Sequence, residues 1–244
     1  TFDYQALIVT GLNANGFDRN NWVAGGKQGF FEVDNFTSPA YVARLDYRGV
    51  PGLRIGGSFY YCVNTASNSD KVATYAGVKA PLRIYTVDGQ YKNKYVTART
   101  NFVFGNLTGA TAISNKNKGL SNSSPYTRVV QVAKKAVSYA GEVGVNLRSI
   151  CNGNKKVPVI YPFARYEYYN PQEAGEKGQL PMDKRNQVSM WTAGLNWYAL
   201  PNLVVKADYM TRQIGTGKVF GKGKYNSENE FSIGIAYVGW FIKK

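Results

Sequence analysis

The feature that most constrains this chain is a two-residue alternation of apolar and polar side chains along most of its 244 residues. In 53–64, the odd positions carry Leu, Ile, Gly, Phe, Tyr and Val, and the even positions carry Arg, Gly, Ser, Tyr, Cys and Asn. Because successive side chains of a strand point to opposite faces, this period indicates strands. The pattern recurs near 41–48, 95–104, 139–148, 160–169, 188–198, 203–212 and 231–237, and more weakly near 4–12 and 83–92. We therefore predict an all-β fold of about ten strands.

The longest stretch without a charged residue, about 186–205, does not change this prediction. It has the length of a membrane-spanning helix, which needs ~20 apolar residues. However, Asn186, Pro201 and Asn202 interrupt it, and 191–198 keeps the period of a strand. We interpret it as a strand followed by a turn.

The connections between these strands alternate between short and long. Turn-forming sequences join the strands at Val50-Pro51-Gly52, Asn93-Lys94 and Leu200-Pro201-Asn202. The other connections, roughly 13–37, 65–81, 106–137, 170–187 and 215–228, are long and rich in Asn, Gly, Ser and Lys. This asymmetry is typical of an antiparallel transmembrane β-barrel with tight periplasmic turns and long external loops. A soluble β-sandwich remains the alternative, although compact domains rarely carry several loops above ~12–15 residues.

A barrel in lipid turns its apolar side chains outward and its polar side chains inward. We expect tyrosine and tryptophan near the strand ends to form interfacial girdles. The candidates are Tyr41, Tyr47, Tyr139, Trp191, Trp197, Tyr209 and Tyr237.

Composition excludes most enzyme chemistry. The chain contains no histidine, which removes the commonest general base and the commonest metal ligand. Its two cysteines, Cys62 and Cys151, lie far apart and indicate neither a zinc site nor a disulfide framework. We therefore predict no catalytic residue, no cofactor and no metal. The formal net charge of +15 is compatible with an anionic partner of some kind.

The segments 161–169, 193–198, 201–202, 206–209 and 231–237 resemble the carboxy-terminal strands of porins of the phosphate-selective porin O and P family, which includes members from Bacteroidetes. The segments 38–63 and 82–104 look like earlier strands of that family. The resemblance covers most of the chain through short motifs. It implies a porin in the outer membrane of a Gram-negative bacterium, with a barrel of ~16 strands. Residues 1–244 would then be one barrel domain that supplies about ten strands and lacks the family's amino-terminal ones.

The chain departs from the usual pattern of outer-membrane proteins at its carboxy terminus, where it runs past Phe241 to Lys243-Lys244 instead of ending on an aromatic residue. No motif fixes individual anion-binding residues, so none is carried over from the family.

Parity along the strands predicts which charged side chains face the lumen. Nine cations are candidates for an anion path: Arg44, Arg48, Arg54, Lys92, Arg99, Arg148, Arg165, Lys206 and Arg212. Five carboxylates share their face: Asp46, Asp88, Glu142, Glu167 and Asp208. Because rings of Arg and Lys favour anions in a pore, we predict passive diffusion of small anionic solutes, phosphate among them. For each cation, the alternative is an ion pair that only holds the strands in register.

The predicted partners are outer-membrane lipid and small anions, and a homotrimer or a larger outer-membrane complex is left open. Nucleic acid is not expected, because stacked bases need aromatic and cationic side chains on one face, whereas here they segregate by parity. The alternative function is a non-conducting barrel that serves as a scaffold or partner subunit. The loop 106–137 is expected to be an exposed external loop; helical spacing near 129–137 leaves open a short helix that dips inward.

Overall fold

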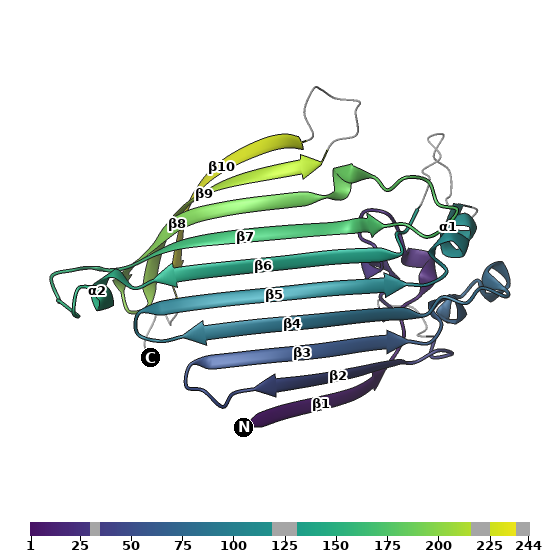
Figure 1. Ribbon diagram of the computed structural model, residues 1–244, viewed down its shortest axis with the longest axis horizontal. Coiled ribbons are helices and arrows are strands. Elements are labelled where there is room, and N and C mark those ends of the chain that lie inside the picture. Colours follow the sequence, from purple (N-terminus) through teal and green to yellow (C-terminus); the bar gives the residue numbers. More distant parts are fainter. Residues whose placement is uncertain (30–34, 119–130, 216–224, 238–244) are drawn as a thin grey trace, which may run out of the picture.

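In the computed structural model, residues 1–29, 35–118, 131–215 and 225–237 are described, and they form one antiparallel sheet of ten strands (Figure 1). Each strand pairs only with its neighbours in sequence. The strands are β1 (Phe2–Val9), β2 (Ala40–Tyr47), β3 (Leu53–Cys62), β4 (Leu82–Lys92), β5 (Val96–Leu107), β6 (Lys135–Val145), β7 (Val159–Ala174), β8 (Val188–Leu200), β9 (Leu203–Gly215) and β10 (Tyr225–Tyr237). The prediction of an all-β fold with about ten strands is confirmed.

The helices are short. They are α1 (Ala110–Lys118), α2 (Leu147–Ile150) and the 3-10 turns η1 (Ala14–Gly16), η2 (Ala24–Gly26), η3 (Thr65–Asn68), η4 (Val72–Tyr75) and η5 (Lys184–Asn186). No helix in the described ranges has the length and apolarity needed to cross a membrane. The helix considered near 129–137 is wrong in its described part, because residues 135–137 begin β6; residues 129 and 130 lie outside the described residues.

The connections divide the sheet into two ends. The turn end carries the connections 48–52, 93–95, 146–158 and 201–202, and the loop end carries the described residues of the connections 10–39, 63–81, 108–134 and 175–187 (Figure 1). The predicted alternation of short and long connections is therefore present. The connection 146–158 is the longest at the turn end, because it contains α2.

Strand register assigns every side chain to one of two faces. The apolar face carries the even-numbered residues of β1, of β5 and of β7 as far as Asn170, and the odd-numbered residues of the other strands. The polar face carries the remaining strand residues. Tyr41, Tyr139, Trp191 and Trp197 lie on the apolar face, as predicted from parity.

Large side chains of the apolar face are exposed although they are hydrophobic. Trp191 is 61 % exposed, Ile233 69 % and Ile235 73 %. The same face exposes Phe2, Tyr4, Ile8, Tyr41, Leu45, Ile55, Tyr85, Val87, Phe102, Tyr139, Val143, Leu195, Trp197, Tyr209 and Phe231. In a soluble sandwich such a face packs on a second sheet. In the described part of this chain, nothing covers it.

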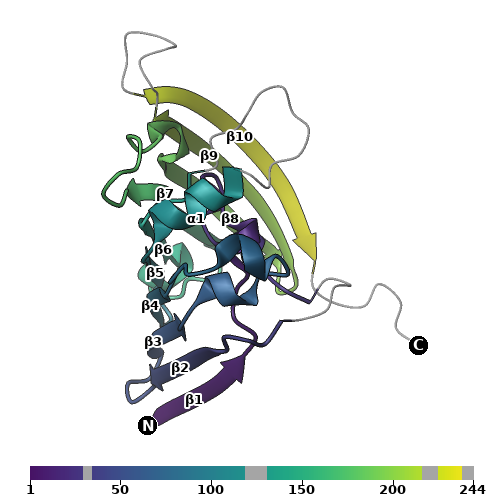
Figure 2. The same cartoon turned by 90° about the vertical axis from the view of Figure 1, so that its right-hand side faces the viewer.

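The buried core lies elsewhere, on the polar face at the loop end. We call it the loop cap, formed by the described segments 11–28, 63–80, 110–118, 131–133 and 175–182 where they pack on the ends of β2 to β5. Its centre contains Phe17, Trp22, Leu82, Leu107 and Ile113. Figure 2 shows the helical segments lying within the curve of the sheet.

The sheet curves but is not closed. Among the described residues, β1 pairs only with β2, and β10 pairs only with β9. The edges of β1 and β10 are not joined to each other. A closed barrel therefore remains a proposal.

Candidate pore wall

Charged side chains gather on the polar face, and the structure balances them more evenly than parity suggested. Within the described strand bounds, this face carries seven cations: Arg44, Arg54, Lys92, Arg99, Arg165, Lys206 and Arg212. It also carries eight carboxylates: Asp3, Asp46, Asp88, Glu142, Glu167, Asp208, Glu228 and Glu230. The predicted excess of cations on this face is not found, because Arg48 and Arg148 lie outside the strands, and Asp3, Glu228 and Glu230 add to the carboxylates.

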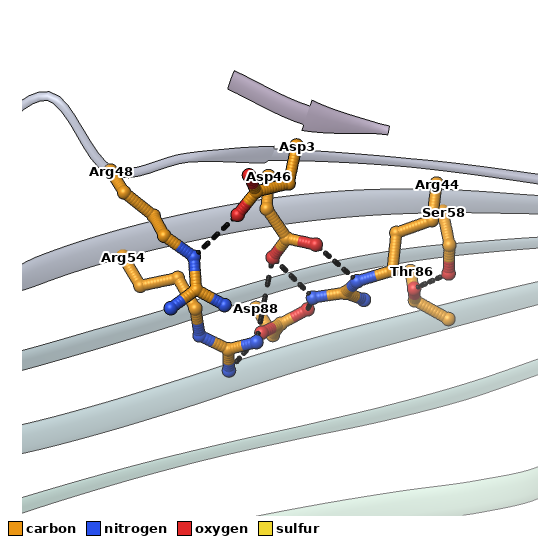
Figure 3. A network of polar contacts seen from close by, with 8 residues as sticks. All are labelled: Asp3, Arg44, Asp46, Arg48, Arg54, Ser58, Thr86 and Asp88. Atoms are coloured by element: carbon orange, nitrogen blue, oxygen red, sulfur yellow. Dashed lines mark hydrogen bonds and ion pairs between the residues drawn. The ribbon is translucent and has the colours of Figure 1, made fainter. Parts of the chain in front are cut away.

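A first ion-pair cluster joins β2, β3 and β4 (Figure 3). The Arg44 Nε lies 2.6 Å from one oxygen of Asp46, and the Arg44 Nη2 lies 2.8 Å from Asp88. Arg54 reaches both carboxylates, at 2.8 Å from Asp88 and 3.4 Å from Asp46. Two guanidinium groups therefore share two carboxylates, a closed arrangement that fixes these side chains against the wall.

Gly56 makes room for this cluster. A Cβ at Gly56 would lie 2.3 Å from Arg44 Nη2 and 2.5 Å from Asp46 Oδ1. Any larger side chain would displace the Arg44 guanidinium from Asp46. In the sequence, Gly56 is only one position of an alternating strand. Nothing in its immediate sequence reveals that an arginine from the neighbouring strand lies across it.

A second ion-pair cluster joins β5, β6 and β7. The Arg99 Nε donates to Glu142 at 3.2 Å, and Arg165 lies 3.0 Å from Glu167 and 3.9 Å from Glu142. The Arg99 side chain is 61 % exposed, so this pairing is open to solvent. Between the two clusters lies a hollow of about 320 Å³ with Gly89, Asn101, Ala140 and Gly141 in its lining.

Two lysines of the polar face are differently placed. In the described part of the chain, neither the Lys92 nor the Lys206 ammonium has a carboxylate within 4 Å. Both line a hollow of about 320 Å³ near the turn end that also contains Arg99 and Tyr161. A neighbouring hollow of about 530 Å³ is lined by Arg48, Arg54 and Lys92, and its lining includes no carboxylate. The hollow at the turn end of the polar face thus combines these two lysines with Arg99 and Glu142.

The remaining predicted cations have separate positions. Arg48 lies just beyond β2, with its Nε 2.8 Å from Asp3, and Arg212 pairs with Glu228 across β9 and β10. Arg148 is not a strand residue, so the prediction that it faces the lumen from a strand is wrong. It lies in α2 and donates to the Val157 carbonyl at 2.6 Å, because the strand β6 ends at Val145.

The loop cap is held by buried polar contacts as well as by apolar packing. The Trp22 indole Nε1 donates to the Ala133 carbonyl at 2.9 Å, and its ring lies over Gly105 of β5. Asn117 of α1 donates to the carbonyls of Ala14 and Phe17, at 3.1 and 3.0 Å. Since buried polar groups are costly when unpaired, these contacts specify one arrangement of the cap. The described part of 106–137 therefore packs into the loop cap through buried Ile113, Asn117 and Val132, while Thr108, Asn115 and Lys116 are exposed. It is not a wholly exposed loop.

Two titratable groups in the long connections have shifted pKa values. Burial raises the pKa of Tyr75 to about 12, and its hydroxyl bonds to the Asn117 side chain. Hydrogen bonds from Arg185 lower the pKa of Asp183, which also lies 3.7 Å from Arg19 of the loop cap. Neither group belongs to a cluster that resembles an acid–base pair.

The described residues contain no group of three or more His, Cys, Asp or Glu side chains placed to hold a metal ion. Cys62 is buried and Cys151 is exposed, and both are free thiols. No family model and no curated protein matches this chain.

Proposed function

We propose that this chain forms the wall of an outer-membrane β-barrel porin that passes small anionic solutes by passive diffusion. One observation carries the proposal: a sheet of ten strands exposes a broad apolar face and keeps most of its charged side chains on the opposite face. Lipid is the solvent that makes such a face stable, since water penalises exposed apolar area by roughly 25 cal/mol per Å². The alternating short and long connections support the same orientation.

Closure of the barrel is part of the proposal. Unpaired backbone groups at a sheet edge cost several kcal/mol each in hydrocarbon, so the edges of β1 and β10 need partners. The resemblance to a porin family with ~16 strands supplies a reason to expect further strands between them. A single barrel, a homotrimer of barrels and a larger complex all satisfy this requirement.

The proposed preference for anions over cations is assigned to the lysines of the polar face and not to its arginines. Arg44, Arg54 and Arg165 are neutralised by carboxylates within 3.0 Å. In the described part of the chain, Lys92 and Lys206 have no carboxylate within 4 Å, and both line a hollow at the turn end whose wall also includes Glu142. Ammonium groups there would raise the local concentration of anions, and the effect should weaken with salt, because the Debye length falls from ~10 Å at 0.1 M to ~3 Å at 1 M.

Single-channel recording in planar bilayers tests this proposal. The wild type should conduct, and its reversal potential in a salt gradient should report anion preference that is strongest at low salt. Lys92→Gln with Lys206→Gln should move the reversal potential toward cations, whereas Lys155→Gln with Lys156→Gln, two exposed lysines in the connection 146–158, should change it less. Equal reversal potentials in wild type and K92Q/K206Q would refute the assignment of selectivity to these lysines.

The loop cap favours one second candidate, a non-conducting scaffold barrel. Its buried core covers the polar face at the loop end, and a wall covered in this way could be closed to solutes. Absence of conductance from correctly inserted wild-type protein would support the scaffold and exclude the porin.

A further inference from the structure

The apolar face carries charge at one place only among the described strands. Arg83 of β4 pairs with Asn106 of β5, and Asn106 pairs with Lys135 of β6. The three side chains therefore form one cross-strand row on the apolar face, and we call it the Arg83 row. It lies beside the loop end, since Arg83 is the second residue of β4 and Lys135 is the first of β6. Beyond the register shift in β7, Glu173 accepts hydrogen bonds from Tyr168 and Asn170 of this face. The other described strand side chains that the register assigns to this face are uncharged.

The polar groups of the Arg83 row are poorly satisfied by the protein. In the described ranges, neither Arg83 nor Lys135 has a carboxylate within 4 Å. The Arg83 guanidinium carbon lies 5.3 Å from the centre of the Tyr61 ring, within the range of a cation–π interaction. The Asn106 Oδ1 atom is buried and has no hydrogen-bond partner among the described residues. The acid on the adjacent strand, Glu173, instead accepts from Asn170 at 2.9 Å.

The next row of the apolar face is aromatic. Phe59, Tyr85, Phe104 and Val137 are paired across β3 to β6, with ring centres 4.9 Å apart for Phe59–Tyr85 and 6.4 Å apart for Tyr85–Phe104. Side chains on one face of a strand repeat every ~7 Å. Positive charge therefore gives way to an apolar aromatic surface within a single repeat.

We propose that the Arg83 row binds the phosphate-bearing headgroup of a lipid whose acyl chains lie on Tyr85 and Phe104. The inference rests on the proposed function, because lipid must surround the apolar face. Neighbouring strands lie ~4.8 Å apart, so the backbones of Arg83 and Lys135 are separated by about 10 Å. Their long side chains can converge on one phosphate or reach two phosphates of one headgroup.

The position distinguishes a lipid from a solute. The Arg83 row lies on the face opposite Lys92 and Lys206, so an anion moving along the polar face does not meet it. In the orientation with long loops outside the cell, the loop end lies at the outer leaflet. A phosphorylated lipid of that leaflet presents its charge at the level of Arg83 and its chains at the level of Tyr85.

The experiment uses the purified chain in detergent and native mass spectrometry with a bisphosphorylated glycolipid as the probe. The wild type should retain this lipid. It should not retain the form of the lipid from which the phosphates have been removed. Arg83→Gln with Lys135→Gln should weaken binding roughly thirty-fold, the equivalent of about 2 kcal/mol for two cations at an anionic lipid surface. Arg83→Lys with Lys135→Arg preserves the charge and should retain most of the affinity. Lys155→Gln with Lys156→Gln removes two exposed charges at the turn end and should bind as the wild type does.

Three outcomes would overturn the proposal. They are unchanged binding in R83Q/K135Q, equal retention of the dephosphorylated lipid, and displacement of the lipid by an equal concentration of inorganic phosphate, which would indicate a general anion site. Bilayer recording distinguishes failure of the lipid-site proposal from failure of the porin proposal. R83Q/K135Q should keep the wild-type reversal potential. If the protein never conducts but its lipid binding depends on Arg83 and Lys135, the lipid site is supported and the porin proposal is rejected.

Discussion

Gly105→Ala should release the first long connection from the wall, because Trp22 occupies the space that a side chain at position 105 would need. A Cβ at Gly105 would lie 1.9 Å from Trp22 Cη2 and 2.2 Å from Cζ3. Contacts this short cannot be relieved by rotation of a rigid indole ring within a packed core. The ring must leave its site, and the hydrogen bond from Nε1 to the Ala133 carbonyl is lost with it.

The size of the effect follows from what Trp22 contributes. Its side chain is buried, with 8 % of its surface exposed, and loss of a buried Trp typically costs about 3–5 kcal/mol. The lost hydrogen bond adds about 1 kcal/mol. Relaxation of the cap recovers part of this cost, so we expect the free energy of opening of the segment 11–28 to fall by about 3 kcal/mol. Its amides should then exchange on the order of a hundred-fold faster.

Hydrogen exchange followed by mass spectrometry measures this directly. Peptides from 11–28 should lose protection in Gly105→Ala, while peptides from β7 and β8 should keep it. Gly141→Ala is the matched control, since it makes the same substitution on the neighbouring strand where no heavy atom lies within 4 Å of the added Cβ. Equal exchange of 11–28 in wild type and Gly105→Ala would show that Trp22 does not hold the loop cap.

Two further predictions concern polar groups in or near the loop cap. Asn68 is fully buried, and its side-chain amide accepts from the Ser38 backbone N–H at 2.8 Å and donates to the Ser38 carbonyl at 2.9 Å. Asn68→Ala should therefore lower the stability measured by thermal unfolding in detergent by about 2–3 kcal/mol, and Asn68→Asp, which cannot donate, should not restore it. A melting temperature equal to that of the wild type would contradict this account. Because Arg185 lowers the pKa of Asp183 in the folded protein, the stability this pair contributes is present above the ordinary carboxyl pKa of about 3.9 and is lost as the pH falls through the lower folded value. Asp183→Asn should therefore cost up to about 1 kcal/mol at pH 7, and in acid denaturation curves the difference from wild type should shrink as the pH falls below the ordinary carboxyl pKa of about 3.9. A difference that stays constant as the carboxyl groups become protonated would be incompatible with it.

Strand alternation was sufficient to predict the sheet, because the two faces of these strands differ so strongly in polarity. It predicted the strands near 41–48 and 53–64 and placed Arg44 and Arg54 on one face with Asp46. It could not show that each arginine is neutralised, since pairing depends on register between strands. Ser58 lies opposite Arg44, whereas Asp88 is reached diagonally across β3.

The loop cap could not be predicted from the sequence for a related reason. Trp22, Gly105 and Ala133 come from three distant segments, and none belongs to a motif with a recognisable spacing. The helix considered near 129–137 followed a real periodicity of Val and Ala. Pairing with β5 and β7 overrides that local preference from Lys135 onward, and the helix forms instead at α1.

The order of the sheet also determines how the chain can assemble. The connections at the turn end join β2 to β3, β4 to β5, β6 to β7 and β8 to β9, and three of these four connections are only a few residues long. Since closing a short loop costs less entropy than closing a long one, these hairpins are the natural first units of folding. The long connections must then bring finished hairpins together edge to edge. The wall is thus modular. Adding or removing one hairpin changes the partners only of the two strands that flank it, and all other strands keep theirs.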